Sequence, residues 1–180
     1  AVTPPPPDTE RRAKRSRRRR GGRKRSSWSL EQFQVPEKPG EVRFHDLGLP
    51  DPIMHAIADL GFKYCTPIQA KVLIHPHAGQ NISGRAQTGT GKTAAFLITI
   101  FSKFLQDPIQ TERPPGSPRA LVLAPTRELA IQIAKDAEDL GKYCHFNCLA
   151  IYGGLEVRRQ QRRLDRAPVD LIVATPGRLL

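Results

Sequence analysis

The chain has 180 residues, a formal net charge of +12 and three cysteines. That length suits one domain with a sizeable core. Three oddly spaced cysteines exclude a disulfide framework, and we expect free thiols in a reducing cytoplasm. Cys144 and Cys148 flank His145, but without a second pair of ligands a metal site is disfavoured. No apolar run reaches the roughly 20 residues that span a membrane, and no signal peptide precedes the core.

The positive charge is concentrated near the N-terminus. Eleven of the 29 Lys and Arg residues fall between Arg11 and Arg25, after the polyproline run Pro4–Pro7. Such dense like charge leaves nothing to bury, so residues 1–40 are predicted to be a disordered basic tail, with Trp28 and Phe33 incidental to it. The tail favours a polyanion, either nucleic acid or an anionic membrane surface, and we favour RNA. The stretch KRSRRRR also fits a nuclear-import signal.

The folded part is predicted to occupy residues 41–180. A first helix runs from Asp51 to Gly61, with Asp and Pro at its start, and a second begins at Thr66-Pro67 and stops before Pro76. A short strand is then predicted over Asn81–Arg85. The helix predicted over Lys92–Leu105 is apolar around most of its circumference and should be well buried.

Strands and helices alternate through the remainder of the chain. The predicted elements after the Pro-rich loop Gln106–Pro118 are a strand over Ala120–Ala124, a helix from Arg127 to about Tyr143, a strand over Cys148–Tyr152, an Arg-rich helix over Glu156–Arg166, a strand over Val169–Ala174 and a helix opening at Pro176. The run ALVLA is continuously apolar, as in a strand buried on both faces. This order predicts an α/β fold with a parallel sheet and helices on both faces.

The segment Ala86–Thr93 reads AQTGTGKT and lies between a predicted strand and a predicted helix. Gly89 and Gly91 let the backbone turn sharply and bring N–H groups close to an anion. Lys92 is placed to reach the β- and γ-phosphates of a nucleotide, and the Thr93 hydroxyl to bind Mg²⁺. The strict phosphate-loop pattern has Gly where Ala86 stands, so a Gly/Thr turn that happens to precede a Lys is the bland alternative.

Three further segments follow predicted strands: Pro125–Ala130, Gly153–Gly154 and Thr175–Arg178. In a parallel sheet the working groups lie beyond the carboxyl ends of the strands. Helix N-termini, glycine amides and arginines at such an edge suit a sugar–phosphate backbone. For any one segment, simple Pro and Gly punctuation is an alternative, but three of them beside a phosphate loop favour nucleic acid.

Five motifs in order resemble those of the DEAD-box RNA helicases. They are GFKYCTPIQ (61–69), AQTGTGKT (86–93), PTRELA (125–130), Gly153–Gly154 and TPGR (175–178), with Phe44 upstream as the isolated aromatic of that family. The resemblance covers about Phe44 to Leu180, and Ala86 is normal for the family. The wording of YCTPIQ and GRAQTGTGKTAAFL is most similar to the bacterial RNA helicase B group, which is cytoplasmic and associated with the RNA degradosome.

The resemblance implies a RecA-like P-loop domain that binds ATP, Mg²⁺ and RNA. It implies that Gln69 reads the adenine edge, that Phe44 and Phe62 wall the adenine pocket, and that Thr93 is the metal ligand. The implied cofactor-binding residues are Phe44, Phe62, Thr66, Gln69, Ala86, Gln87, Thr88, Gly89, Thr90, Gly91, Lys92 and Thr93, with Lys92 and Thr93 as catalytic candidates. The implied RNA-binding residues are Pro125, Thr126, Arg127, Gly153, Gly154, Thr175, Pro176, Gly177 and Arg178.

The sequence contains no Asp-Glu-Ala-Asp motif and no second RecA-like domain. We therefore expect an incomplete N-terminal part of a helicase that binds ATP weakly and does not turn it over alone. The full protein is expected to bind single-stranded RNA and short duplexes, with degradosome components such as an endoribonuclease as partners. Two alternatives stay open: a P-loop ATPase of another class such as a DNA-directed motor, which Gln69 disfavours, and a non-enzymatic RNA-binding module.

Overall fold

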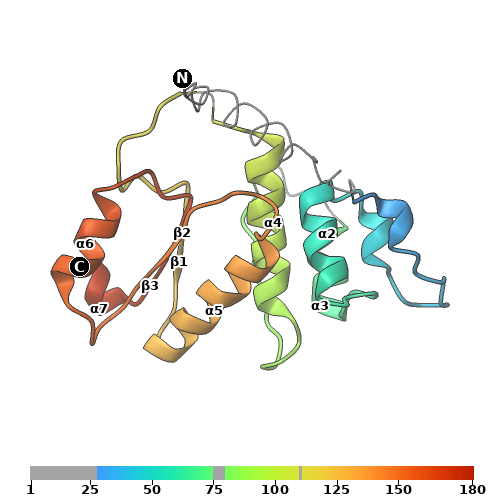
Figure 1. The fold of residues 1–180 in the computed structure, drawn as a ribbon. Coiled ribbons are helices and arrows are strands. Elements are labelled where there is room, and N and C mark those ends of the chain that lie inside the picture. The colour runs from blue at the N-terminus through green and yellow to red at the C-terminus, as the bar shows by residue number, and fades with distance from the viewer. Residues whose placement is uncertain (1–27, 75–79, 110) are drawn as a thin grey trace, which may run out of the picture.

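The computed structural model describes residues 28–74, 80–109 and 111–180 (Figure 1). The basic run Arg11–Arg25, and most of the tail predicted over residues 1–40, lie outside the described residues. The elements in chain order are η2 (Leu30–Gln32), η3 (Phe44–Leu47), α2 (Asp51–Asp59), α3 (Pro67–Leu73), α4 (Lys92–Gln106), β1 (Ala120–Leu123), α5 (Arg127–Leu140), β2 (Cys148–Ile151), α6 (Val157–Leu164), β3 (Leu171–Ala174) and α7 (Pro176–Leu179). Among these residues no helix combines the length and the apolar character needed to cross a bilayer.

The sheet has three parallel strands in the order β1-β3-β2. Ala174, the last residue of β3, lies opposite Leu123 of β1 and Ile151 of β2. All three carboxyl ends therefore lie at the same edge. Figure 1 shows α4 and α5 on one side of the strands and α6 and α7 on the other. The predicted α/β class with a parallel sheet is confirmed.

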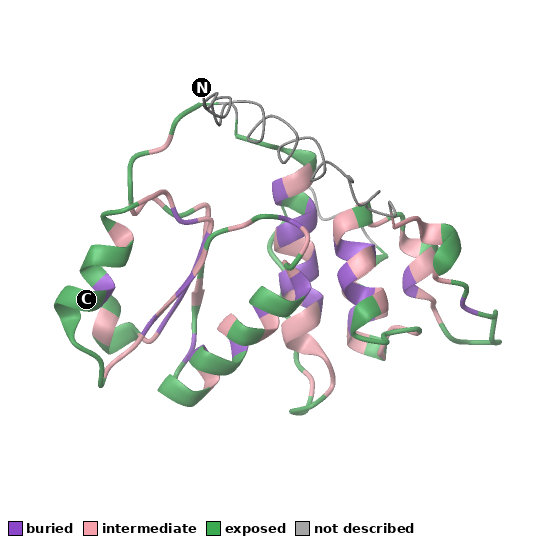
Figure 2. Ribbon diagram, viewed as in Figure 1, coloured by how far each residue is buried: buried purple, intermediate pink, exposed green. Residues whose placement is uncertain are grey.

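The central strand β3 divides the core into two clusters. Leu171 and Val173 belong to the main cluster with the apolar side chains of α2, α4 and α5, whereas Ile172 and Ala174 belong to a smaller cluster against which Leu164 of α6 packs. Successive side chains of a strand point to opposite faces, so all four residues of β3 can be buried only because helices cover both faces. Figure 2 shows buried residues along β3, α4 and α2.

The prediction that Ala120–Ala124 is buried on both faces is wrong. Ala120 and Val122 pack against the main cluster, but Leu121 is 46% and Leu123 is 56% exposed. Leu121 and Leu123 are exposed because β1 is an edge strand. The second face of the sheet is covered over β2 and β3 only. An apolar run shows that a strand could be buried on both faces. Whether it is buried depends on which faces the neighbouring helices cover.

The strand predicted over Asn81–Arg85 is also wrong, since the structure has no regular element there and all five residues are exposed. Asn81, Ser83 and Gly84 have weak strand propensity. Ile82 is the one large apolar side chain in the segment, and it remains 48% exposed. One half-exposed isoleucine gives too little apolar burial to fix the segment against the sheet.

The packed part of the chain begins earlier than predicted. The Trp28 ring stacks on His55 with 4.7 Å between the ring centroids, and His55 stacks on Tyr143 at 3.7 Å. Val35 is only 6% exposed, and its carbonyl oxygen accepts a hydrogen bond of 2.9 Å from Arg43. Residues 28–35 are thus held against the domain, and Trp28 is a packing residue of it.

Replacing Phe101 by alanine should destabilise the fold strongly. The Phe101 ring in α4 is fully buried and contacts the rings of Phe104 and Phe146. Loss of so large a core side chain costs about 3–5 kcal/mol of unfolding free energy, measurable by urea denaturation. Ile131→Ala, at a position 41% exposed, is the control and should change that energy by less than about 0.5 kcal/mol. Equal effects of the two substitutions would contradict the described core.

The free thiols should be much less reactive in the folded chain than after unfolding. Burial raises the pKa of Cys65 and Cys144 to about 11 and that of Cys148 to about 12. At pH 8 the folded thiols stay protonated, while unfolded ones ionise near about 8.5. We expect iodoacetamide to alkylate the native chain at least about tenfold more slowly than the urea-unfolded chain, and stability to fall as the pH rises above about 8.5. Equal alkylation rates would refute this.

Candidate functional site

The loop before α4 has the backbone that a phosphate site needs. Gly89 and Gly91 have φ angles of 78° and 85°, in the left-handed region that glycine adopts without strain. Gly91 is also the N-cap residue of α4, and it offers no side chain to the helix. The first N–H groups of a helix have no partner within it and carry partial positive charge. The loop and the start of α4 therefore present donors and positive potential in one place.

The ammonium of Lys92 lies across this loop. Its Nζ atom donates hydrogen bonds to the carbonyl oxygens of Ala86 and Gln87. The Thr90 hydroxyl donates to the same Gln87 oxygen at 2.8 Å, which fixes the loop from the other side. An ammonium has three hydrogens, so one N–H remains for an external oxygen. The carbonyl oxygens of the loop thus fix the position of the Lys92 charge.

Gln69 joins the second motif to the loop. Thr66 and Gln69 form a capping box at the start of α3, in which the Thr66 N–H donates to Gln69 Oε1 at 2.8 Å. From the same two residues, Thr66 Oγ1 donates to the Thr90 carbonyl at 2.8 Å and Gln69 Nε2 donates to the Gly91 carbonyl at 3.2 Å. The start of α3 is therefore tied to the phosphate loop by two hydrogen bonds.

This contact gives a second reason for a glycine at position 91, besides its left-handed backbone. A Cβ atom at Gly91 would lie 2.3 Å from Gln69 Nε2 and 3.3 Å from Thr66 Oγ1. Gln69 is only 4% exposed, yet its amide can form four hydrogen bonds and the capping box and loop use two. One donor and one acceptor are left, which are the two groups that an adenine edge requires.

A cavity of about 850 Å³ adjoins the loop and brings several predicted residues together. Of the predicted cofactor-binding residues, Phe62, Gln69, Thr88, Gly89, Gly91, Lys92 and Thr93 line it. Phe62 is 37% exposed, whereas Phe44 is 1% exposed and lies behind it, with 6.3 Å between the ring centroids. The surface offered to a ligand is therefore that of Phe62, and Phe44 supports it from the core.

The far wall of the cavity contains acidic side chains that the sequence analysis did not single out. Asp136 and Asp139 of α5 both line it. Burial raises the pKa of the Asp136 carboxyl, and the neighbouring charge of Asp139 raises it further. Their spacing of three residues places them on one helix face. The sequence alone could not show that this face turns toward the loop.

The other predicted motifs meet at the edge where the strands end. The Thr126 hydroxyl caps α5 by accepting from the Leu129 N–H at 3.2 Å. The next residue, Arg127, places its guanidinium 5.6 Å from the centre of the Tyr152 ring. A Cβ atom at Gly154 would lie 2.6 Å from Arg127 Nη1, and Gly154 has a φ of 89°. The two-glycine turn after β2 and the start of α5 are therefore in direct contact.

The fourth segment joins the same edge through β3. The Thr175 N–H donates to the Ile151 carbonyl at 3.0 Å, which fixes the start of α7 beside the end of β2. One terminal nitrogen of Arg178 is buried and makes no hydrogen bond within the described part of the chain. Thr126, Arg127, Gly153, Gly154, Thr175 and Arg178 all follow the carboxyl ends of parallel strands. The candidate site thus combines a loop with free N–H donors at the start of α4 with a neighbouring edge rich in amides and guanidinium groups.

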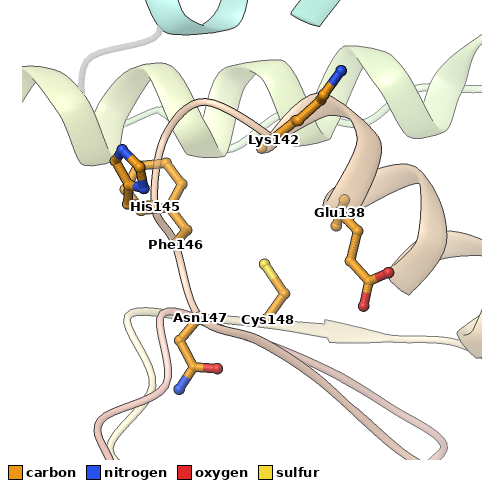
Figure 3. A pocket seen from close by; sticks show the side chains of 8 residues that line it. Glu138, Lys142, His145, Phe146, Asn147 and Cys148 are labelled. Carbon is orange, nitrogen blue, oxygen red and sulfur yellow. The ribbon is translucent and has the colours of Figure 1, made fainter. Parts of the chain in front are cut away.

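A second pocket, of about 280 Å³, lies between the end of α5 and the start of β2 (Figure 3). His145 lies on the turn between these elements, with a positive φ of 57°, and Cys148 begins the strand. The described residues contain no group of three or more His, Cys, Asp and Glu side chains that could hold a metal ion. This pocket lies at the amino ends of the strands, opposite the candidate site.

Comparison with known proteins agrees with this geometry. The ATP-dependent RNA helicases RhlB of Pseudomonas putida and Pseudomonas aeruginosa are each 56% identical to this chain over 146 residues, covering 81% of this chain and 37% of the relative. The protein of the same name from Idiomarina loihiensis is 47% identical over 140 residues, which are 78% of this chain and 32% of the relative. The chain therefore spans about a third of the length of these curated relatives.

Two solved structures share the fold. The crystal structure of the RNA-helicase Prp28 from Chaetomium thermophilum bound to ADP has a TM-score of 0.68 and 32% identity, covering 83% of this chain and 37% of that chain. A DEAD box protein from Methanococcus jannaschii has a TM-score of 0.65 and 36% identity, covering 78% of this chain and 36% of that chain. A model of the DEAD/DEAH box helicase family matches residues 66–180. The phosphate loop, the glutamine tied to it and these matches together show that the chain belongs to the DEAD/DEAH box helicase family.

Proposed function

We propose that this chain binds ATP and part of an RNA strand, and that the whole protein couples ATP hydrolysis to the local unwinding of RNA duplexes. The observation that carries the proposal is the buried amide of Gln69, bonded to Gly91 beside the Lys92 ammonium. This arrangement joins a group able to read a base to a loop able to hold phosphates. The printed names of the RhlB relatives support the same activity.

The nucleotide site is proposed to use the cavity beside the loop. The base lies near Phe62, where the remaining donor and acceptor of Gln69 are selective for adenine. The triphosphate binds the amides of the loop and the Lys92 ammonium, and the Thr93 hydroxyl is the proposed Mg²⁺ ligand. One of the similar structures is bound to ADP, which supports a nucleotide in this family fold.

The RNA site is proposed to lie along the edge beyond the strands. Arg127, the amides of Gly153 and Gly154, Thr175 and Arg178 suit phosphate and sugar oxygens. Such contacts contain no base information, so RNA of any sequence should bind. The basic run Arg11–Arg25 would add affinity that falls steeply with salt.

Cellular context is proposed from the resemblance of the motifs to the RNA helicase B group. We infer a cytoplasmic protein whose partners include RNA degradosome components such as an endoribonuclease. Free cysteines fit that reducing compartment. We also infer that the boundary between basic tail and folded domain lies close to Trp28, since that residue already packs on His55.

Removing the Lys92 charge should weaken ATP binding. The ammonium is fixed in the loop, so Lys92→Ala removes a charge-assisted contact worth about 1.5–3 kcal/mol, a factor of roughly 10–100 in Kd. Titration calorimetry with ATP and Mg²⁺ measures the change. Lys103→Ala, at an exposed position near the other end of α4, removes the same charge and should leave the Kd unchanged. Equal affinity in the Lys92 and Lys103 variants would refute the site.

Base selectivity should depend on Gln69. Gln69→Glu keeps an acceptor for the Thr66 N–H but loses the amide donor, so the preference for ATP over GTP should fall about tenfold. Competition binding with the two nucleotides gives the ratio. Gln132→Ala, which alters the same cavity from α5, is the control and should keep the parent preference. Indifference to the base in the parent chain would favour a P-loop ATPase of another class.

A further inference from the structure

The outer face of α6 is unusually basic. Arg158, Arg159, Arg162 and Arg163 are all exposed within this helix of eight residues. At 100° per residue these four positions fall in one continuous arc of about 140°. On the opposite side, Gln160 is 6% exposed and Leu164 packs against the smaller core cluster. We call the four arginines and the surface they form the α6 basic face.

No carboxylate within the described residues forms a salt bridge with the α6 basic face. Arg162 Nε donates to the Arg158 carbonyl of the same helix, which leaves both charges in place. Arg158 with Arg162, and Arg159 with Arg163, are like-charged pairs four residues apart, and such pairs destabilise a helix. The face therefore weakens its own helix slightly, and an external anion would relieve that repulsion.

The position of α6 links this face to the proposed RNA edge. The helix follows β2 through the Gly153–Gly154 turn. Gln160 Nε2 donates to the Tyr152 carbonyl at 2.9 Å, and the ring of Tyr152 lies below the Arg127 guanidinium. The first turn of α6 is thus anchored to the residue that positions Arg127. Arg162 and Arg163 lie one turn further along, about 6 Å from the first pair.

We propose that the α6 basic face binds the phosphates of an RNA strand that leaves the edge at Gly153–Gly154. This inference rests on the proposed RNA binding and extends the RNA path beyond the family motifs. Guanidinium groups bind phosphate oxygens through paired N–H donors, and an unneutralised row of them complements a polyanion. Continuity with the two-glycine turn favours RNA over an acidic protein surface as the occupant.

The test compares salt dependence of RNA binding in the 180-residue chain and three variants. In the first, Arg158, Arg159, Arg162 and Arg163 are replaced by glutamine, which preserves helix propensity. In the second, the same four become lysine. In the third, the exposed lysines Lys63, Lys71, Lys103 and Lys135 become glutamine, which removes the same charge elsewhere. Kd for an unstructured RNA oligonucleotide is measured by fluorescence anisotropy over a range of salt.

Each single-strand phosphate contact contributes about −0.7 to the slope of log K against log salt. The glutamine variant of α6 should therefore lose about 2–3 units of slope, the lysine variant should keep most of the parent slope, and the control should match the parent. The N-terminal basic run is the same in the parent chain and in every variant, so its contribution to the slope cancels in each comparison. Two half-variants, Arg158→Gln with Arg162→Gln and Arg159→Gln with Arg163→Gln, should each lose about half as much.

A parent-like slope in the α6 glutamine variant would overturn the inference, even if that variant lost affinity for an acidic protein. An equal loss of salt slope in the control, where Lys63, Lys71, Lys103 and Lys135 become glutamine, would overturn the inference too. The total charge of the chain, and not the position of the arginines, would then be the cause. Arg127→Ala separates this inference from the proposed function. If Arg127→Ala weakens RNA binding while the α6 variant does not, the α6 inference alone fails; if only the α6 variant weakens it, the proposed edge fails.

Discussion

The hydrogen bond from the Gln69 amide to the Gly91 carbonyl is the constraint around which the site is built. It holds the start of α3 against the loop, and the capping box with Thr66 fixes the rotamer that makes it. Glycine is required at position 91 for two reasons. Its backbone has a left-handed conformation, and a Cβ atom there would collide with the Gln69 amide. The proposed base reader and the proposed phosphate loop are thereby joined by direct hydrogen bonds. Such preorganisation lowers the entropy lost when a ligand binds.

The parallel register supplies the other half of the arrangement. With Leu123, Ala174 and Ile151 level, every loop after a strand must emerge at one edge. Arg127 can then lie against Gly154 although 26 residues separate them in the chain. The burial of β3 on both faces keeps that edge in place, since its side chains join both core clusters. Backbone pairing in the core thus determines which amides and guanidinium groups lie at the proposed RNA-binding edge.

Prediction from the sequence succeeded where local pattern and final environment agree. Helices α4 and α5 were predicted close to their observed bounds, since each contains the apolar side chains that it buries in the domain. The strand β1 was predicted correctly, but its burial on both faces and the strand over residues 81–85 were not, because these depend on elements distant in sequence. The motifs named Gln69 and Phe44 as site residues, but only the structure shows that Gln69 also bonds the loop and that Phe44 lies behind Phe62. Tertiary contacts of this kind leave no periodic signal.

Two arginines of the described domain form several contacts within the fold, unlike the four arginines of the α6 basic face. Arg43 is paired with Asp46 and Glu37 and bonds the Val35 carbonyl, and Arg113 bonds Asp170 and two carbonyl oxygens. Arg43 also holds the pKa of the Asp46 carboxyl below its usual range. Arg43 ties residues 35–37 to its own turn, and Arg113 ties its loop to the residues just before β3, which is the ordinary structural use of a guanidinium. Among the residues that the structure describes, the arginines of α6 form no such ties with another segment, although the helix is fixed to the core by Gln160 and Leu164. A helix whose cationic face pairs with no carboxylate of the described residues, and which lies beside a two-glycine turn, is better suited to an external polyanion than to the stability of its own domain.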